Sequence, residues 1–167
     1  MSTYTLVQPR AWRREWELLR GDEVRAVLRM STFLPRIRAD VAGRPVRIEQ
    51  RGWWRKEDVV CDASTDEEVA RLHSDGRRRL LELAGRTLEW KRLGRKEGFG
   101  FVGESGQPLL IAKLKGGIVR FFGEVAVDSG IPEAQALLLA VLAAYLLIRR
   151  NAAAVAGATA AAGATSV

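Results

Sequence analysis

The densest cluster of charged side chains in the sequence is basic and occupies two neighbouring segments. Its members are Arg77, Arg78, Arg79, Lys91, Arg92, Arg95 and Lys96. A two-residue hairpin turn at 84–85 would place Arg78 directly opposite Lys91 on the adjacent strand. Like charges directly opposite each other destabilise a sheet, so this arrangement predicts a site for an anion on the outer face. The alternative interpretation is a pair of ordinary, solvated basic strands.

A second candidate site is a segment rich in tryptophan and cations between two expected strands. It contains Arg51, Trp53, Trp54, Arg55 and Lys56. Indole rings favour the headgroup depth of a membrane, and cations beside them attract acidic lipid. The segment therefore fits a membrane-interface loop. The alternative is that one tryptophan packs under the end of a barrel while the cations are solvated.

The segment Gly98–Gly103 has the spacing of a dinucleotide-binding glycine motif and is also similar to the core of an RNA-recognition strand. A dinucleotide site requires a helix that opens within the motif, whereas Phe99 to Val102 alternates like a strand and a hairpin follows. An RNA-recognition strand begins with Lys or Arg and ends with Phe or Tyr, but Glu97 and Glu104 hold those positions here. We expect both phenylalanines to belong to the core.

The sequence lacks the combinations of residues that enzymes and metal sites require. His73 is the only histidine and Cys61 the only cysteine, so a nucleophile–base pair or a zinc site would need unusual components. We interpret Cys61 as a small buried hydrophobe in a reducing compartment. An acidic run lacks the ligand spacing of a calcium loop and is interpreted as solvated; it comprises Glu57, Asp58, Asp62, Asp66, Glu67 and Glu68. We predict no catalytic residue, no cofactor and no bound metal.

Length and charge limit the class of protein. The 167 residues correspond to one domain, and the net charge of +7 permits anionic partners such as acidic phospholipid, nucleic acid or acidic protein. The N-terminal residues lack the apolar core of a signal peptide. We therefore expect a cytoplasmic protein, either free or peripheral to the inner face of the membrane, with acidic lipid favoured over nucleic acid as its partner.

One strongly apolar helix is predicted over residues 132–150, and it must be surrounded on every side. Its uninterrupted apolar run, Ala136–Ile148, is about 20 Å long at a rise of 1.5 Å per residue. A bilayer core requires about 20 apolar residues, and shorter runs are more often buried core helices. We therefore expect the helix inside the protein. The alternative is a tail-anchored membrane protein that uses 134–148 as its span.

The rest of the chain alternates apolar and polar residues, with turn residues at short intervals, which predicts β-hairpins. Twelve strands are expected, near residues 4–8, 15–20, 23–30, 36–41, 45–51, 57–61, 67–72, 77–84, 86–93, 98–103, 108–115 and 118–127. Residues 65–73 are ambiguous, because Thr65 to Glu68 also fits a helix capping box. We assign a strand there, because the segment is short and residues 74–76 are typical of a hairpin turn.

Twelve hairpin-linked strands followed by an apolar helix predict a mainly β fold, a closed antiparallel barrel wrapped around a C-terminal helix. Closure removes exposed sheet edges. A barrel of about eight strands is just filled by its own side chains, so a twelve-stranded one needs a plug, for which the helix is the candidate. The expected domain covers 1–150, with its central helix at about 132–150. The Ala- and Gly-rich tail 151–167 is expected to be disordered.

In this organisation the chain resembles the tubby-like superfamily, which includes phospholipid scramblases and small bacterial proteins. The resemblance covers about residues 4–150 and lies in the terminal helix and the segments Glu17–Leu28, Ile37–Ile48, Val59–Leu72, Leu81–Trp90, Phe99–Leu114 and Gly123–Val127. It implies a non-enzymatic barrel that associates with membranes through phosphoinositides or other acidic lipids. The acidic calcium-binding stretch and the cysteine cluster of scramblases have no counterpart here, so lipid scrambling is not expected.

The favoured function is therefore a non-enzymatic barrel that binds acidic lipid headgroups or acts as a membrane-peripheral interaction module. The alternatives are the tail-anchored membrane protein and a protein that binds RNA or other nucleic acid through its basic strands. Deleting 132–150 separates the first two hypotheses, because a barrel would unfold whereas an anchored domain would stay folded and become soluble.

Overall fold

The computed structural model describes residues 1–10, 13–31, 36–53, 56–94, 97–115 and 122–163, which contain twelve strands and one helix. The strands are β1 (Ser2–Val7), β2 (Glu15–Arg20), β3 (Glu23–Met30), β4 (Arg36–Val41), β5 (Arg44–Arg51), β6 (Glu57–Asp62), β7 (Glu68–Asp75), β8 (Arg78–Leu83), β9 (Arg86–Gly94), β10 (Gly98–Val102), β11 (Pro108–Leu114) and β12 (Phe122–Val127). The helix α1 is Glu133–Gly163. The twelve predicted strands are confirmed, including the ambiguous one that becomes β7. Residues 118–121, predicted as the start of the last strand, lie outside the described residues.

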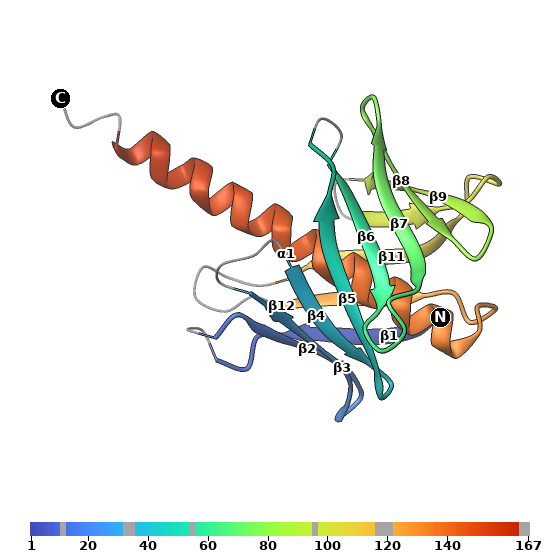
Figure 1. Cartoon of the computed structure of the whole chain (residues 1–167). Helices are drawn as coiled ribbons and strands as arrows, with labels where there is room; N and C mark the ends of the chain where they lie inside the picture. The colour runs from blue at the N-terminus through green and yellow to red at the C-terminus, as the bar shows by residue number, and fades with distance from the viewer. Residues whose placement is uncertain (11–12, 32–35, 54–55, 95–96, 116–121, 164–167) are drawn as a thin grey trace.

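The strands form one closed antiparallel barrel in chain order (Figure 1). Each strand pairs with its neighbours in sequence, and β1 closes the barrel by pairing with β12 from Ser2–Val127 to Val7–Phe122. Every strand therefore has a partner on both sides, so the barrel has no free edge that could recruit another chain. The predicted fold class is confirmed.

The turn at 84–85 sets the register of the β8–β9 hairpin. Ala84 and Gly85 have φ values of 50° and 74°. Positive φ at both central residues is typical of a type I′ turn, whose twist matches that of the flanking strands. The turn pairs Leu83 with Arg86, as the sequence predicts.

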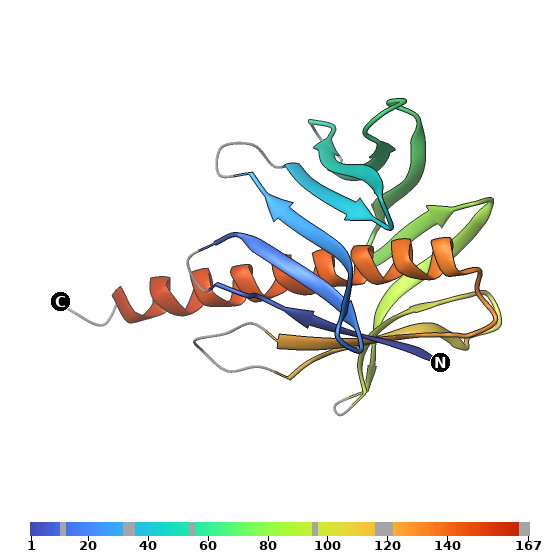
Figure 2. The same ribbon diagram turned by 90° about the horizontal axis from the view of Figure 1, so that it is seen from below.

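The inward faces of the strands and α1 share one apolar core. Side chains alternate across each strand, so that in β4 Ile37, Ala39 and Val41 are buried while the residues between them are exposed. α1 runs through the barrel (Figure 2), and every residue from Leu139 to Ile148 is buried. Each fully buried leucine contributes about 1.5–3 kcal/mol relative to exposure, so the helix is a major part of the core. The predicted plug is confirmed.

The helix also has the properties of a membrane span. From Glu133 to Ala154 its length and apolar composition would suffice to cross a bilayer, with a mean hydropathy of 1.6. In this structure, however, 67% of the most apolar 18 residues of this stretch are buried inside the protein. The core helix of a soluble protein has the same properties, and α1 contacts β3, β4, β11 and β12. The residues proposed as a span in the tail-anchor hypothesis thus serve here as the core of the barrel.

The helix is longer than the sequence analysis predicts. It continues from residue 150 to Gly163, so residues 151–163, which were expected to be disordered, are helical. The expectation rested on the lack of bulky side chains in this segment, whereas alanine has the highest intrinsic helix propensity. This extension projects beyond the strands in both views (Figures 1 and 2). Residues 164–167 lie outside the described residues.

The two ends of the barrel differ in their relation to the helix. α1 begins beside the β2–β3 turn, where Glu133 Oε1 lies 2.7 Å from Arg25 Nη2 and 3.5 Å from Arg20 Nη1. We call this the entry end, and the opposite end, where α1 leaves the barrel, the exit end. Because neighbouring strands are antiparallel, the connections that follow odd-numbered strands lie at the exit end and those that follow even-numbered strands lie at the entry end.

Candidate anion-binding site

A pocket of about 860 Å³ lies at the exit end, between the β8–β9 hairpin and the last buried turn of α1. It is lined by Arg77, Arg78, Arg79, Glu89, Trp90, Lys91, Arg92, Phe99, Leu146, Arg149, Arg150, Ala153 and Ala154. Seven of these side chains are cations and one is a carboxylate. We call this cavity the exit pocket.

The β8–β9 hairpin brings the two halves of the predicted basic cluster together. Its register continues from the 84–85 turn to the pair Arg79–Trp90, and the next residues of the two strands are Arg78 and Lys91. Both line the exit pocket, as do the other members Arg77 and Arg92. The structure thus brings these five cations to one pocket, but the pocket is not confined to the outer face, because α1 forms one of its walls. Arg95 and Lys96 lie outside the described residues.

Two cations of the pocket, Arg149 and Arg150, come from α1 and were not predicted as site residues. The topology explains their position. β12 ends at the entry end, so the helix starts there at Glu133 and rises about 24 Å over its next 16 residues. That distance brings the first charged residues after the apolar run to the exit end. The two adjacent arginines are plain in the sequence, but their place at the exit end could be predicted only with the strand order known.

Asp58 connects the helix to the barrel wall at the base of the pocket. Its side chain is only 2% exposed and receives an ion pair from Arg79. Arg149 Nη1 lies 3.1 Å from Asp58 Oδ1 and 3.2 Å from Oδ2, and it also donates a 2.8 Å hydrogen bond to the Tyr145 hydroxyl. Burial, with Asp58 nearby, raises the pKa of Tyr145, so the phenol stays neutral. Asp58 was interpreted as part of a solvated acidic face, and the structure places it in the interior instead.

Aromatic rings line the same pocket beside the cations. The rings of Trp90 and Phe99 are stacked with centroids 5.8 Å apart, and Phe101 packs against Trp90 at 4.9 Å. The guanidinium carbon of Arg150 lies 4.4 Å from the centroid of the Phe99 ring, a cation–π contact. Arg150 is thereby positioned by a ring, and no carboxylate among the described residues pairs with it, which keeps its charge available to a ligand.

The pocket has more cations than carboxylates to balance them. Arg78 pairs with Asp75 at 3.0 Å and Lys91 Nζ lies 3.7 Å from Glu89, while Arg79 and Arg149 share Asp58. Within the described part of the chain, three pocket cations have no carboxylate partner; they are Arg77, Arg92 and Arg150. The exit pocket therefore carries a strong net positive charge.

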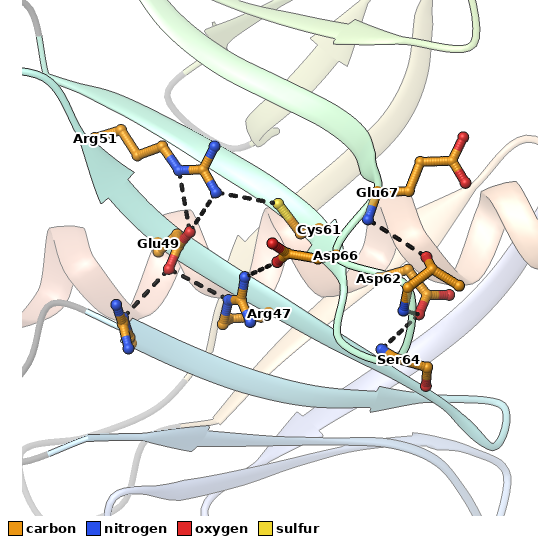
Figure 3. A network of polar contacts seen from close by, with 10 residues as sticks. Arg47, Glu49, Arg51, Cys61, Asp62, Ser64, Asp66 and Glu67 are labelled. Atoms are coloured by element: carbon orange, nitrogen blue, oxygen red, sulfur yellow. Dashed lines mark hydrogen bonds and ion pairs between the residues drawn. The ribbon is translucent and has the colours of Figure 1, made fainter.

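In the predicted membrane-interface segment, residues 51–56, the first arginine is held in an ion pair, whereas the described residues after it are exposed. Arg51 is held at the end of β5, where its Nη2 lies 2.6 Å from Glu49 Oε1 and 3.7 Å from Cys61 Sγ (Figure 3). Arg51 is thus held by Glu49, although its side chain remains 49% exposed. Trp53 is 89% exposed, so it does not pack under the end of the barrel. Lys56 is exposed, and Trp54 and Arg55 lie outside the described residues.

Glu49 is the centre of the network in Figure 3. It lies 3.2 Å from Arg36 and 3.3 Å from Arg47, in addition to Arg51. The hydrogen bond from Arg51, with the charges of the other two arginines, holds the pKa of Glu49 below its ordinary value. Cys61 lies buried beneath this layer, which agrees with its interpretation as a small buried hydrophobe. The network ties β4, β5 and β6 together outside the core.

The glycine motif at 98–103 has a steric explanation. It forms strand β10, and a turn rather than a helix follows it. A Cβ atom on Gly100 would lie 2.3 Å from the backbone oxygen of Leu110, so the close approach of β11 requires glycine there. Phe101 is fully buried, and Phe99 packs against the core. The expectation that both phenylalanines are core residues is confirmed for Phe101, whereas Phe99 is only partly buried and also lines the exit pocket.

Three of the remaining carboxylates of the acidic run pair with arginines, whereas Asp62 accepts hydrogen bonds from the backbone N–H groups of Ser64 and Thr65. Arg71 lies 3.4 Å from Glu57 and 2.8 Å from Glu68, and Arg47 pairs with Asp66. Among the described residues, no three His, Cys, Asp or Glu side chains form a group that could hold a metal ion.

Comparison with models of protein families, with curated proteins and with solved structures gave no match. The class that the structure defines is thus a closed, helix-filled β-barrel with a cationic pocket at one end.

Proposed function

We propose that this protein is a non-enzymatic barrel that binds the phosphate-bearing headgroup of an acidic lipid in the exit pocket. The observation that carries the proposal is the composition of the pocket wall, where seven cations and two aromatic rings surround about 860 Å³ of space. Arginine predominates among the cations, and its planar guanidinium binds phosphate oxygens in a bidentate manner.

The filled lumen determines where such a ligand lies. Because α1 occupies the interior, the open space of the exit pocket is at the rim of the barrel, where the helix emerges. The volume falls within the range of about 300–1,000 Å³ that small-molecule sites have. A headgroup fits this position, because its acyl chains remain free to stay in a membrane while the phosphate enters the pocket.

The arrangement of twelve antiparallel strands around a C-terminal helix supports a second part of the proposal, that the chain is a tubby-like barrel at the cytoplasmic face of a membrane. A tail-anchored arrangement is less favourable physically. It would remove Leu137, Leu142 and Leu147, all buried within the barrel, and leave the lumen without a core.

The direct test is a calorimetric titration with dihexanoyl phosphatidylserine below its micellar concentration. Dihexanoyl phosphatidylcholine tests whether net charge is needed, and inorganic phosphate tests whether phosphate alone suffices. The Arg92→Gln/Arg150→Gln variant removes two pocket cations that have no carboxylate partner among the described residues. The Arg44→Gln/Arg86→Gln variant removes two exposed cations at the entry end.

We expect the wild type to bind the serine lipid more tightly than the choline lipid. The pocket variant should bind it at least 100-fold more weakly, because each charge-assisted hydrogen bond contributes about 1.5–3 kcal/mol. The entry-end variant should bind like the wild type. Equal binding of the two lipids, or equal affinity of the two variants for the serine lipid, would refute lipid binding in this pocket. If inorganic phosphate bound as tightly as the serine lipid, the ligand would be a free anion and the lipid proposal would be wrong.

A further inference from the structure

The connections between strands are segregated by charge. At the exit end the described connecting residues include the cations Arg10, Arg13, Arg14, Lys56, Arg77 and Lys115 and one acid, Glu97. At the entry end all connecting residues are described, and they contain no cation and five acids, namely Asp22, Asp66, Glu67, Glu104 and Asp128. The charged side chains on the helix follow the same pattern, with Glu133 at the entry end and Arg149 and Arg150 at the exit end.

The length of the barrel makes this segregation physically significant. The strands have five to nine residues, most of them six to eight, which extend for about 20–27 Å at 3.3–3.4 Å per residue. A tilt of about 40° shortens this to about 15–21 Å along the barrel axis. The Debye length is about 8 Å at physiological ionic strength. A charged surface in contact with the exit end is therefore screened from the acids at the entry end. The two ends act as separate electrostatic surfaces, and the exit end is attractive to an extended acidic surface.

Two apolar features project from the same end. Trp53, in the connection between β5 and β6, is 89% exposed. The helical extension 151–163 contains no charged residue and projects beyond the strands (Figures 1 and 2). At 1.5 Å per residue it reaches about 20 Å from the barrel, which is enough to pass the headgroup layer of a bilayer. An indole and an uncharged helix at the same end of the barrel as these cations match the layering of an acidic membrane surface.

We infer that the whole exit end is a docking surface for an acidic bilayer, with the barrel axis directed toward the membrane and the 151–163 extension entering the interfacial layer. The inference extends the proposed headgroup site, since it gives the membrane-facing end and the orientation of the barrel. It rests on different residues, because the connection between β1 and β2 does not line the exit pocket.

The test is sedimentation with vesicles of phosphatidylcholine containing 30 mol% phosphatidylserine. The docking variant is Arg10→Gln/Arg13→Gln, which neutralises two exposed arginines at the exit end. The matched control is Arg44→Gln/Arg86→Gln, which removes the same charge at the entry end. Each cation near an anionic surface contributes about fivefold in affinity, so the docking variant should bind about 25-fold more weakly. The control should change binding less than twofold.

A second measurement reports the orientation. A polarity-sensitive fluorophore attached at Thr159→Cys in a Cys61→Ala background should shift to the blue with acidic vesicles, and the same label at Glu104→Cys should not. Equal losses of affinity in the two arginine variants, or no shift at 159, would overturn the inference. So would binding of a single-stranded RNA 20-mer more tightly than of the vesicles, since the basic end would then serve nucleic acid.

The outcomes separate the inference from the proposed function. Binding of dihexanoyl phosphatidylserine without any effect of Arg10→Gln/Arg13→Gln on vesicle binding would refute end-on docking alone. A vesicle affinity that depends on these arginines, without binding of the soluble lipid, would refute the headgroup pocket alone.

Discussion

Replacing Asp58 by asparagine should weaken folding and strengthen anion binding at the same time. Asp58 is the buried carboxylate shared by Arg79 and Arg149, and the substitution removes its charge while keeping its shape. Removing one partner of a fully buried ion pair costs about 3–5 kcal/mol. The arginine side chains are 34% and 39% exposed, so solvent screens them and the expected loss is about 2–3 kcal/mol.

The effect on affinity has the opposite sign. Without Asp58, both guanidinium groups lose their shared counter-charge next to the exit pocket. A unit charge a few ångströms from a ligand in a hydrated site contributes roughly 1 kcal/mol, so dihexanoyl phosphatidylserine should bind about fivefold more tightly.

Urea denaturation and calorimetric titration measure the two effects in the same sample. Asp75→Asn is the matched control, because it removes the carboxylate from an exposed pair with Arg78 and should cost less than about 1 kcal/mol. A stability loss equal to that of Asp75→Asn would show that the Asp58 link does not join helix and barrel. Weaker lipid binding by a folded Asp58→Asn protein would show that these arginines do not face the ligand.

Two further predictions concern the scaffold. The hydrogen bond from Arg51 lowers the pKa of Glu49 in the folded protein. Ionised Glu49 therefore stabilises the fold fully above the unfolded pKa of about 4.5. This contribution disappears as the pH falls through the lower pKa of the folded state. Urea denaturation should therefore show Glu49→Gln less stable than wild type at pH 7, with the difference shrinking between pH 5 and pH 3; a constant difference would contradict the ion-pair account. Gly100→Ala should cost about 1–3 kcal/mol through overlap with Leu110, whereas Gly103→Ala, whose Cβ would have its nearest neighbour at 3.7 Å, should cost less. Equal thermal unfolding curves for these two variants would contradict the close-approach argument.

The fold could be predicted from the sequence because its signals are local and agree with one another. Alternation of apolar and polar residues defines each strand, and short glycine turns such as 84–85 define the hairpins and their register. The central helix was inferred from two signals: its uninterrupted apolar run is shorter than a bilayer core, and twelve strands leave a lumen that their own side chains do not fill. The second signal matters more, because the whole helix from Glu133 to Ala154 is long enough to span a bilayer. The helical extension beyond 150 was missed because packing, rather than the helix propensity of alanine, was used as the criterion.

The site was predicted only where its residues belong to one hairpin. Arg77 to Arg79, Lys91 and Arg92 are brought together by a local turn, so sequence reasoning could find them. Arg149 lies in the same pocket only because β12 ends at the entry end, so that the helix starts there and runs through the barrel to the exit end. The role of Asp58 depends on which face of β6 it occupies. Its spacing of two from buried Val60 was the available signal, because residues two apart share a face.

The central claim is that the exit pocket binds an acidic headgroup, and side-chain NMR tests it most directly. Titration of ¹⁵N-labelled protein with dihexanoyl phosphatidylserine should shift the Nε–H signals of Arg92 and Arg150 and the indole signal of Trp90, all of which line the pocket. The Nε–H signals of Arg44 and Arg86, at the entry end, should stay in place. Shifts confined to the entry-end arginines, or no shift at Arg92, Arg150 and Trp90 at saturating lipid, would contradict the account.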